Sequence, residues 1–428
     1  MEWVPAAVMF ALFALNVPVA FAIASAAMVF FLTAQGVQIE ALIQRMVSVT
    51  HSFPLLAVPF FILTGVIMNH AGISRRIMNL ADAFTGHMVG GLAQINVLLS
   101  TIMAGMSGSS TADAAMQAKI LVPEMTRRGY DKAFSAALTA CSALIATMIP
   151  PSIGLILYGV LADVSIGRLF AAGIVPGVIL CAAMMVTARA ISGRRGYLPS
   201  RPQKARLKER AVVFRDAFWA LLIPVGIVGG LRYGVFTPTE AGAAAALYAT
   251  LIGLFIYRDL KLRDFPQIIL ETVLLTSIVM LIIGAANGFG FYLAWEQIPP
   301  KAAEIMLGLT RDPIVLLLII NLFLLIIGTF MDGAAALVLL TPLLAPIVID
   351  PTYGIDPVHF GVIFMLNLEI GAVTPPLGIV MYTAISIVGV PIERYIKEAL
   401  PLLGALIFVL FLVTFVPAIS LTLPRLMF

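Results

Sequence analysis

The chain has 428 residues, of which 61% are hydrophobic and only 11% are charged, and its mean hydropathy is +1.05. Soluble domains carry about 25% charged residues, so this composition excludes a soluble protein and predicts an integral membrane protein. The net charge of +4 does not predict nucleic-acid binding, because the basic residues lie in short loops between apolar segments, where they set the topology.

Long apolar segments along the chain are predicted to cross the bilayer, since a spanning helix needs roughly 20 apolar residues. The alternation that is typical of barrel strands is missing, so we expect helices. The first segment is too long for a signal-peptide core and is predicted to be retained. The predicted spans are Val4–Leu32, Pro54–Asn69, Asp131–Leu161, Arg168–Arg189, Arg215–Leu231, Pro238–Tyr257, Asp264–Leu293, Pro357–Val388 and Ala399–Leu423.

Two further segments, Met88–Met125 and Pro313–Ile349, have polar, glycine-bearing interruptions at Gly105–Thr111 and Gly328–Gly333. Each segment is predicted to be a re-entrant hairpin that enters and leaves the membrane by the same face. Non-helical backbone at that depth is tolerated only where protein or a water-filled cavity surrounds it.

A second interruption also occurs twice, as Ile149–Ser152 (IPPS) and Thr374–Leu377 (TPPL), and in both cases a glycine lies 21 residues before the first proline. Paired interrupted segments in matching places are typical of transporters with internal repeats, and they mark the binding site. Close helix packing or a simple kink is the alternative. Two glycine-bearing interruptions and two proline pairs occur in matching places, and this matched spacing favours internal repeats over a simple kink.

The basic residues predict the orientation. With a cytoplasmic N-terminus and hairpins that do not cross, about 20 of the 26 Lys and Arg residues face the cytoplasm, which is the positive-inside pattern. Five predicted crossings separate the hairpins. Because this number is odd, the hairpins open from opposite sides, and the halves are predicted to be inverted repeats. The C-terminus is then periplasmic.

The interruptions offer oxygen ligands for a cation such as Na⁺, because unwound carbonyls and helix C-terminal ends point into the gap. The prolines Pro150, Pro151, Pro375 and Pro376 cannot donate backbone hydrogen bonds and leave upstream carbonyls unpaired. The opposite helix ends, with free N–H groups, suit a carboxylate. The tips also supply the hydroxyl groups of Ser107, Ser109, Ser110, Thr111, Thr329 and Thr374.

Acidic side chains at membrane depth are costly and usually functional. Asp332 fits two roles equally, a cation ligand or a cap for the returning helix. For Asp113 an N-cap of the helix that follows it is favoured. Glu369 and Asn367 precede the second interruption, and structural roles are favoured for them over a role in the cavity.

Several motifs together resemble the large membrane subunit (the DctM-like permease) of tripartite ATP-independent periplasmic (TRAP) transporters, and the resemblance covers nearly the whole chain. The matching motifs are Gly108–Asp113, Ile149–Gly154, Phe236–Ala241, Gly354–Gly361 and Thr374–Gly378.

The resemblance implies a Na⁺-coupled importer of an organic acid in the bacterial inner membrane, with no cofactor other than Na⁺ as the coupling ion. The implied partners are a separate small four-helix membrane subunit and a soluble periplasmic binding protein that delivers the acid. It also implies an elevator movement of a transport domain against a scaffold. In chain order the implied parts are scaffold at 1–87, transport domain at 88–190 (hairpin 88–126, broken helix 131–162), a basic cytoplasmic linker at 191–214, scaffold at 215–310, and transport domain at 311–428 (hairpin 313–349, broken helix 357–388).

The matched motifs predict one cation site in each half, with the substrate carboxylate between the tips near Ser109, Ser110, Asp332 and Thr374. The predicted cation-site residues are Ser107, Gly108, Ser109, Ser110, Thr111, Pro150, Pro151 and Ser152 in one half, and Gly328, Thr329, Asp332, Thr374, Pro375 and Pro376 in the other.

Two other functions remain open. One is a Na⁺-coupled carboxylate symporter that works without partners, and the other is a channel or a structural membrane protein. An enzyme is not predicted, because the sequence has no metalloprotease, nucleotide-binding or hydrolase motif. The sequence does not identify the acid, the Na⁺ stoichiometry or the oligomeric state.

Overall fold

The computed structural model describes residues 3–15, 17–34, 36–48 and 51–428. In this part of the chain every regular element is helical. Within the described ranges, seven helices are long and apolar enough to cross a membrane. This architecture confirms the prediction of an all-helical polytopic membrane protein.

The elements follow one another along the chain with short connections. The first half contains α1 (Val4–Ala14), α2 (Val19–Thr33), α3 (Glu40–Ser48), η2 (Phe53–Leu56), α4 (Ala57–His70), α5 (Ile73–Thr85), α6 (Gly91–Ser107), α7 (Ser110–Arg127), α8 (Lys132–Ala143), η3 (Leu144–Thr147), α9 (Ile153–Leu161) and α10 (Ile166–Arg195). The second half contains α11 (Leu207–Arg232), α12 (Pro238–Leu251), η4 (Ile252–Tyr257), η5 (Leu262–Asp264), α13 (Phe265–Trp295), α14 (Ile298–Leu309), α15 (Pro313–Phe330), α16 (Gly333–Ile349), α17 (Pro357–Val373), α18 (Ile379–Val388), α19 (Ile392–Phe415) and α20 (Ala418–Met427).

The order of elements repeats at a distance of 225 residues: α5 begins at Ile73 and α14 at Ile298. In each copy, a helix pair (α6–α7, α15–α16) precedes an interrupted helix (α8–α9, α17–α18) and a long helix (α10, α19). A Gly-x-Asp triplet precedes each interrupted helix, at 129–131 and at 354–356, and it has the same role in both copies. Their glycines have φ of 83° and 60°, where glycine is favoured. The aspartates Asp131 and Asp356 are the N-caps of α8 and α17.

Three predicted boundaries are wrong. The segment Val4–Leu32 is two helices that pack on each other, α1 and α2, because Pro18 precedes α2 and the Val17 N–H bonds back to the Leu12 carbonyl. The last span starts at Ile392 and ends at Phe415, and α20 follows as a separate helix.

The third correction concerns the predicted linker at 191–214. Helix α10 continues to Arg195 and α11 starts at Leu207, so only Gly196–Arg206 connects them. This segment, which we call the connector, contacts α5 and the start of α8. Arg201 pairs with Asp82 of α5 at 2.6 Å, and the Tyr197 hydroxyl accepts the Asp131 N–H at 3.0 Å.

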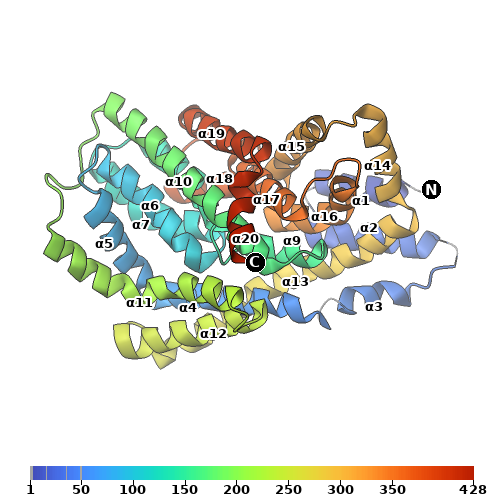
Figure 1. The fold of residues 1–428 in the computed structure, drawn as a ribbon, viewed down its shortest axis with the longest axis horizontal. Coiled ribbons are helices and arrows are strands. Elements are labelled where there is room, and N and C mark those ends of the chain that lie inside the picture. The colour runs from blue at the N-terminus through green and yellow to red at the C-terminus, as the bar shows by residue number, and fades with distance from the viewer. Residues whose placement is uncertain (1–2, 16, 35, 49–50) are drawn as a thin grey trace.

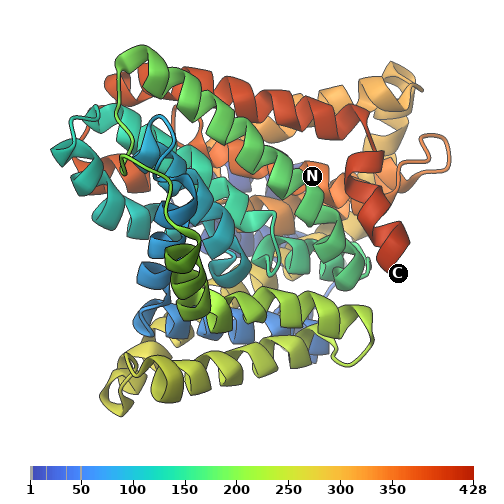
Figure 2. The ribbon, with the colours of Figure 1, turned by 60° about the vertical axis from the view of Figure 1, so that its left-hand side comes forward.

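Two sets of helices form opposite edges of the molecule. Helices α4, α11 and α12 run along one edge of the molecule, and α10 and α19 run along the opposite edge (Figures 1 and 2). Helices α6, α7, α9, α16 and α17 lie between these edges (Figure 1). Helix α8 packs against α19 and α7, and α17 packs against α15 and α16. The repeated interruptions are therefore placed inside the molecule.

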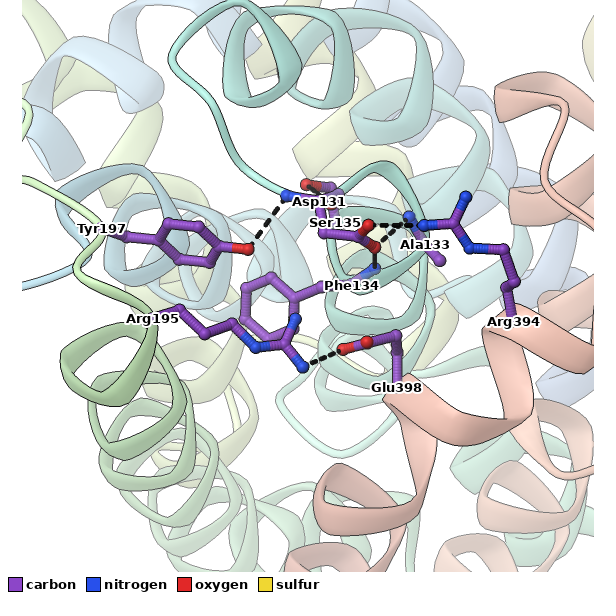
Figure 3. A network of polar contacts seen from close by, with 8 residues as sticks. All are labelled: Asp131, Ala133, Phe134, Ser135, Arg195, Tyr197, Arg394 and Glu398. Atoms are coloured by element: carbon purple, nitrogen blue, oxygen red, sulfur yellow. Dashed lines mark hydrogen bonds and ion pairs between the residues drawn. The ribbon is translucent and has the colours of Figure 1, made fainter.

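Ion pairs join α8, α10 and α19 at one end. The Arg394 guanidinium lies 2.7 Å from Asp131 Oδ2, and Arg195 lies 2.7 Å from Glu398 (Figure 3). The second Asp131 oxygen accepts the N–H groups of Ala133 and Phe134. One side chain thus caps α8 and also binds the other half of the chain.

Candidate functional site

The first tip is the turn between α6 and α7. Helix α6 ends at Ser107, and Gly108 has a left-handed φ of 60°. The Ser109 hydroxyl accepts the Ala112 N–H at 3.4 Å and caps α7. The favoured role of Asp113 as an N-cap is therefore wrong, because Asp113 lies inside the first turn of α7, where it is buried.

The first interruption lies directly against this tip. Between η3 and α9 the Pro150–Pro151 bond is cis, and the Ser152 hydroxyl caps α9 by accepting the Leu155 N–H at 3.3 Å. A Cβ atom on Gly108 would lie 2.6 Å from the Pro151 carbonyl oxygen. The structure thus brings together Gly108 and Pro151, two of the residues predicted to form the first cation site.

The second tip is the turn between α15 and α16. One oxygen of the Asp332 carboxylate accepts the N–H groups of Ala334 at 3.0 Å and Ala335 at 3.4 Å, so Asp332 is the N-cap of α16. This geometry establishes the capping role. Its role as a cation ligand stays a prediction.

The second interruption packs on the second tip as well. The Pro375–Pro376 bond is cis, and the Thr374 hydroxyl donates to the Ile370 carbonyl at 2.6 Å. A Cβ atom on Gly371 would lie 2.5 Å from the Gly328 backbone. The end of α15 therefore contacts the last turn of α17.

Glu369 links the two tips, although structural roles were favoured for it in the sequence. It lies on α17, is 5% exposed, and interacts with the Ser110 side chain of the first tip and with the charge of Asp332 of the second. Its signal in the sequence is a charged residue inside a predicted spanning segment, which is itself a mark of function.

Buried polar side chains hold the helix pairs against the interrupted helices. In the first half, Ser100 of α6 bonds Ser142 of α8 at 2.9 Å and Gln117 of α7 at 3.2 Å. In the second half, Asn367 of α17 donates to Asn321 of α15 at 2.8 Å. Such bonds fix both tips in position, since buried polar groups are costly when unpaired.

The donors at the tips suit a hard cation. They are hydroxyl, carbonyl and carboxylate oxygens, and two buried carboxylate oxygens, Asp113 Oδ2 and Glu369 Oε2, have no hydrogen-bond partner in the described part of the chain. Oxygen ligands of this kind bind hard cations, whereas imidazole and thiolate ligands favour transition metals. Among the described residues, His, Cys, Asp and Glu form no group of three that could hold a metal. A hard cation therefore fits these oxygen donors better than a transition metal does.

Comparison with known sequences gives a match over nearly the whole chain. The profile of the family described as "Tripartite ATP-independent periplasmic transporter, DctM component" matches residues 6–419. The sialic acid TRAP transporter large permease protein SiaM of Vibrio cholerae is 42% identical, over 96% of this chain and 95% of that protein. The C4-dicarboxylate TRAP transporter large permease protein DctM of Pseudomonas aeruginosa is 39% identical, over 90% of each chain.

A longer relative is also similar. The isethionate TRAP transporter permease protein DctMQ of Oleidesulfovibrio alaskensis is 41% identical over 97% of this chain, but the match covers only 66% of that protein. Among solved structures, the YdaH transporter of Alcanivorax borkumensis has a TM-score of 0.66 at 15% identity and covers 95% of this chain and 98% of its own. At this identity the likeness concerns the fold alone.

Proposed function

Because the chain belongs to the DctM component family of TRAP transporters, we propose that it is the permease through which a bacterium imports an organic anion with Na⁺. Family membership identifies the chain as the large permease subunit of a transporter and not as an enzyme. The observation that carries the proposal is that each tip packs against its own proline-pair helix, Gly108 on Pro151 and Gly328 on Gly371. Two such half-sites provide oxygen ligands for cations on both sides of one central position.

The substrate class follows from the relatives. Their names specify sialic acid, C4-dicarboxylate and isethionate, all of which are organic anions. In this chain the anion is proposed to lie between the tips, near Ser109, Ser110, Asp332 and Thr374. The Asp332 carboxylate repels an anion until a cation is bound beside it, and this repulsion couples the two ligands.

The proposed movement is an elevator. The two helix pairs, the two interrupted helices and the long helix that follows each of them (α10 and α19) would move together as the transport domain, and the remaining spans would form the scaffold. The repetition of elements at 225 residues supports two half-sites within one moving unit, and the inverted orientation predicted from charge places their openings on opposite sides.

Two partners are proposed. The family is tripartite. The match covers only 66% of the longer relative, and the rest of that protein is consistent with a small subunit that is fused there and separate here. A soluble binding protein would deliver the anion at the outer face. A groove of about 490 Å³ between the ends of α9 and α16, bordered by Asp163 and Asp350, lies on the side predicted to face it.

Reconstitution with both partners in liposomes tests this function. Uptake of an organic anion should require the binding protein and an inward Na⁺ gradient. Asp332→Asn should keep the cap, since Asn is also a good N-cap, but should weaken the Na⁺ dependence at least tenfold. Asp312→Asn is the matched control, because Asp312 caps the far end of α15.

Two results would contradict the proposal. Unchanged Na⁺ dependence in Asp332→Asn would remove this carboxylate from the cation site. Transport by the purified chain without either partner would favour a stand-alone symporter instead.

A further inference from the structure

Glu369 lies where the two tips meet. A Cβ atom on Gly333 would lie 3.2 Å from Glu369 Oε1, so the carboxyl group packs against the first residue of α16, next to Asp332. From the other half of the chain, the Ser110 side chain of α7 reaches the same carboxyl group. Glu369 therefore packs on the second half-site and interacts electrostatically with Ser110 of the first.

The surroundings of Glu369 do not neutralise it. In the described part of the chain its carboxyl group interacts with Ser110 and with the negative charge of Asp332, and its Oε2 atom is buried without a hydrogen-bond partner. Two ionised carboxylates that share an enclosed place repel each other, so either one of them takes up a proton or a cation lies between them. The geometry thus leaves a place for a positive charge.

The repeat shows that packing does not require a carboxylate here. The residue 225 positions before Glu369 is Leu144, an apolar side chain that is fully buried. At the position of Asp332, the N-cap of the second helix of the pair, the first copy has Ser109. Both acidic residues are thus absent from these positions in the first copy, and they occur together in the second.

We propose that Glu369 is a ligand of the Na⁺ site at the second tip and couples this site to the first tip through Ser110. This inference rests on the proposed function, because it assigns a further ligand to a cation site of that transporter. It explains how one bound cation positions both tips around the anion. A cation between Glu369 and Asp332 draws α16 and α17 together. Because Ser110 of α7 interacts with Glu369, the bound cation also helps to position α7.

Na⁺-dependent thermal stability of the purified complex with its small subunit tests the assignment without measuring transport. The melting temperature is recorded against NaCl with choline chloride at constant ionic strength. Glu369→Gln should lower the apparent Na⁺ affinity about tenfold or more, because the number of charged ligands sets cation affinity. Without Na⁺, the same variant should melt at the wild-type temperature or above it, since a buried unpaired charge has been removed.

Two further variants separate the ligand role from a structural one. Ser110→Ala should weaken Na⁺ binding in the wild type and have little added effect in Glu369→Gln, because the two residues act as one unit. Glu369→Asp, which keeps the charge, should retain a weakened Na⁺ response and remains informative if Glu369→Gln does not fold. The exposed Glu393→Gln is the control.

Each result has a clear meaning. A wild-type Na⁺ response in Glu369→Gln, together with a lost response in Asp332→Asn, would overturn the inference and leave the proposed function intact. A wild-type protein that does not respond to Na⁺ at all would overturn both.

Discussion

The Asn367 side chain donates a hydrogen bond of 2.8 Å to Asn321, and 225 residues earlier the Ser142 hydroxyl donates one of 2.9 Å to Asn96. The donors lie on the interrupted helices α17 and α8, and the acceptors lie on α15 and α6, the first helices of the two pairs. The two halves of the chain therefore attach a tip to its interruption by the same buried contact.

Asn321→Leu should lower the thermal stability. The change removes the acceptor of Asn367 and the donor to Thr414, and Asn367 Oδ1 is already unpartnered in the described structure. Hydrogen bonds between membrane helices are worth about 0.6 kcal/mol on average. With the unpaired group left behind, we expect about 1–2 kcal/mol in total. Unfolding in detergent measures the loss. Asn79→Leu on the exposed side of α5 should cost much less, and equal losses would contradict the prediction.

Gly371→Ala should separate the second tip from its interruption. A methyl group at Gly371 would lie 2.5 Å from the Gly328 backbone, so α15 and α17 must move apart, at a cost of about 1–3 kcal/mol. Both the melting temperature and Na⁺-driven uptake should fall. Gly404→Ala on α19, which has open space around it, is the control and should leave both unchanged. An uptake rate equal to that of wild type would show that the close approach is dispensable.

Asp131→Ala should destabilise the protein more than Arg394→Gln (Figure 3). The arginine is 62% exposed, and its ion pair with Asp131 is worth about 0–1 kcal/mol. The aspartate also caps α8 through Ala133 and Phe134, and loss of a cap adds about 0.5–2 kcal/mol. Chemical unfolding of the two variants and of the double variant compares these contributions. The order would be reversed if the ion pair dominated.

The combined variant Asp163→Asn and Asp350→Asn should weaken the use of the binding protein. These residues border the groove between α9 and α16, and charges at the rim of an interface mainly affect association. Asparagine tolerates the left-handed φ of 54° at Asp163. We expect the binding-protein concentration for half-maximal uptake to rise about threefold or more at low salt, with an unchanged maximal rate. Glu393→Gln is the control, and an unchanged half-maximal concentration would remove this groove from the docking face.

The sequence predicts the chain path best where single residue types, such as glycine and proline, restrict the backbone directly. Gly108 at a left-handed φ and the paired prolines constrain the chain path locally, so the first tip and both interruptions could be placed from residue types. The second tip has no left-handed glycine in the described structure and is marked instead by the cap residue Asp332. The break between α1 and α2 has a single proline, and it lies inside an otherwise continuous apolar segment. Apolarity alone does not distinguish one helix of that length from two.

The role proposed for Glu369 is harder to predict from the sequence, because it depends on contacts between distant segments of the chain. Ser110 and Asp332 approach it from segments 259 and 37 residues away, and no periodicity encodes those distances. The assignment of Asp113 failed for a related reason. A helix cap is fixed by the residue at which the turn ends, and Ser109 rather than Asp113 ends it.

The connector also limits how far its neighbours can separate. Tyr197 holds the start of α8 through Asp131, and Arg201 holds α5 through Asp82. Arg201 is only four positions after Tyr197, so their Cα atoms can be at most about 14 Å apart in a fully extended chain. The two contacts therefore limit how far α8 and α5 can move apart. If α8 moves further from α5 than this segment can extend, either the Tyr197 contact or the Arg201 contact must break. The length of the segment therefore sets the largest separation at which both contacts remain intact.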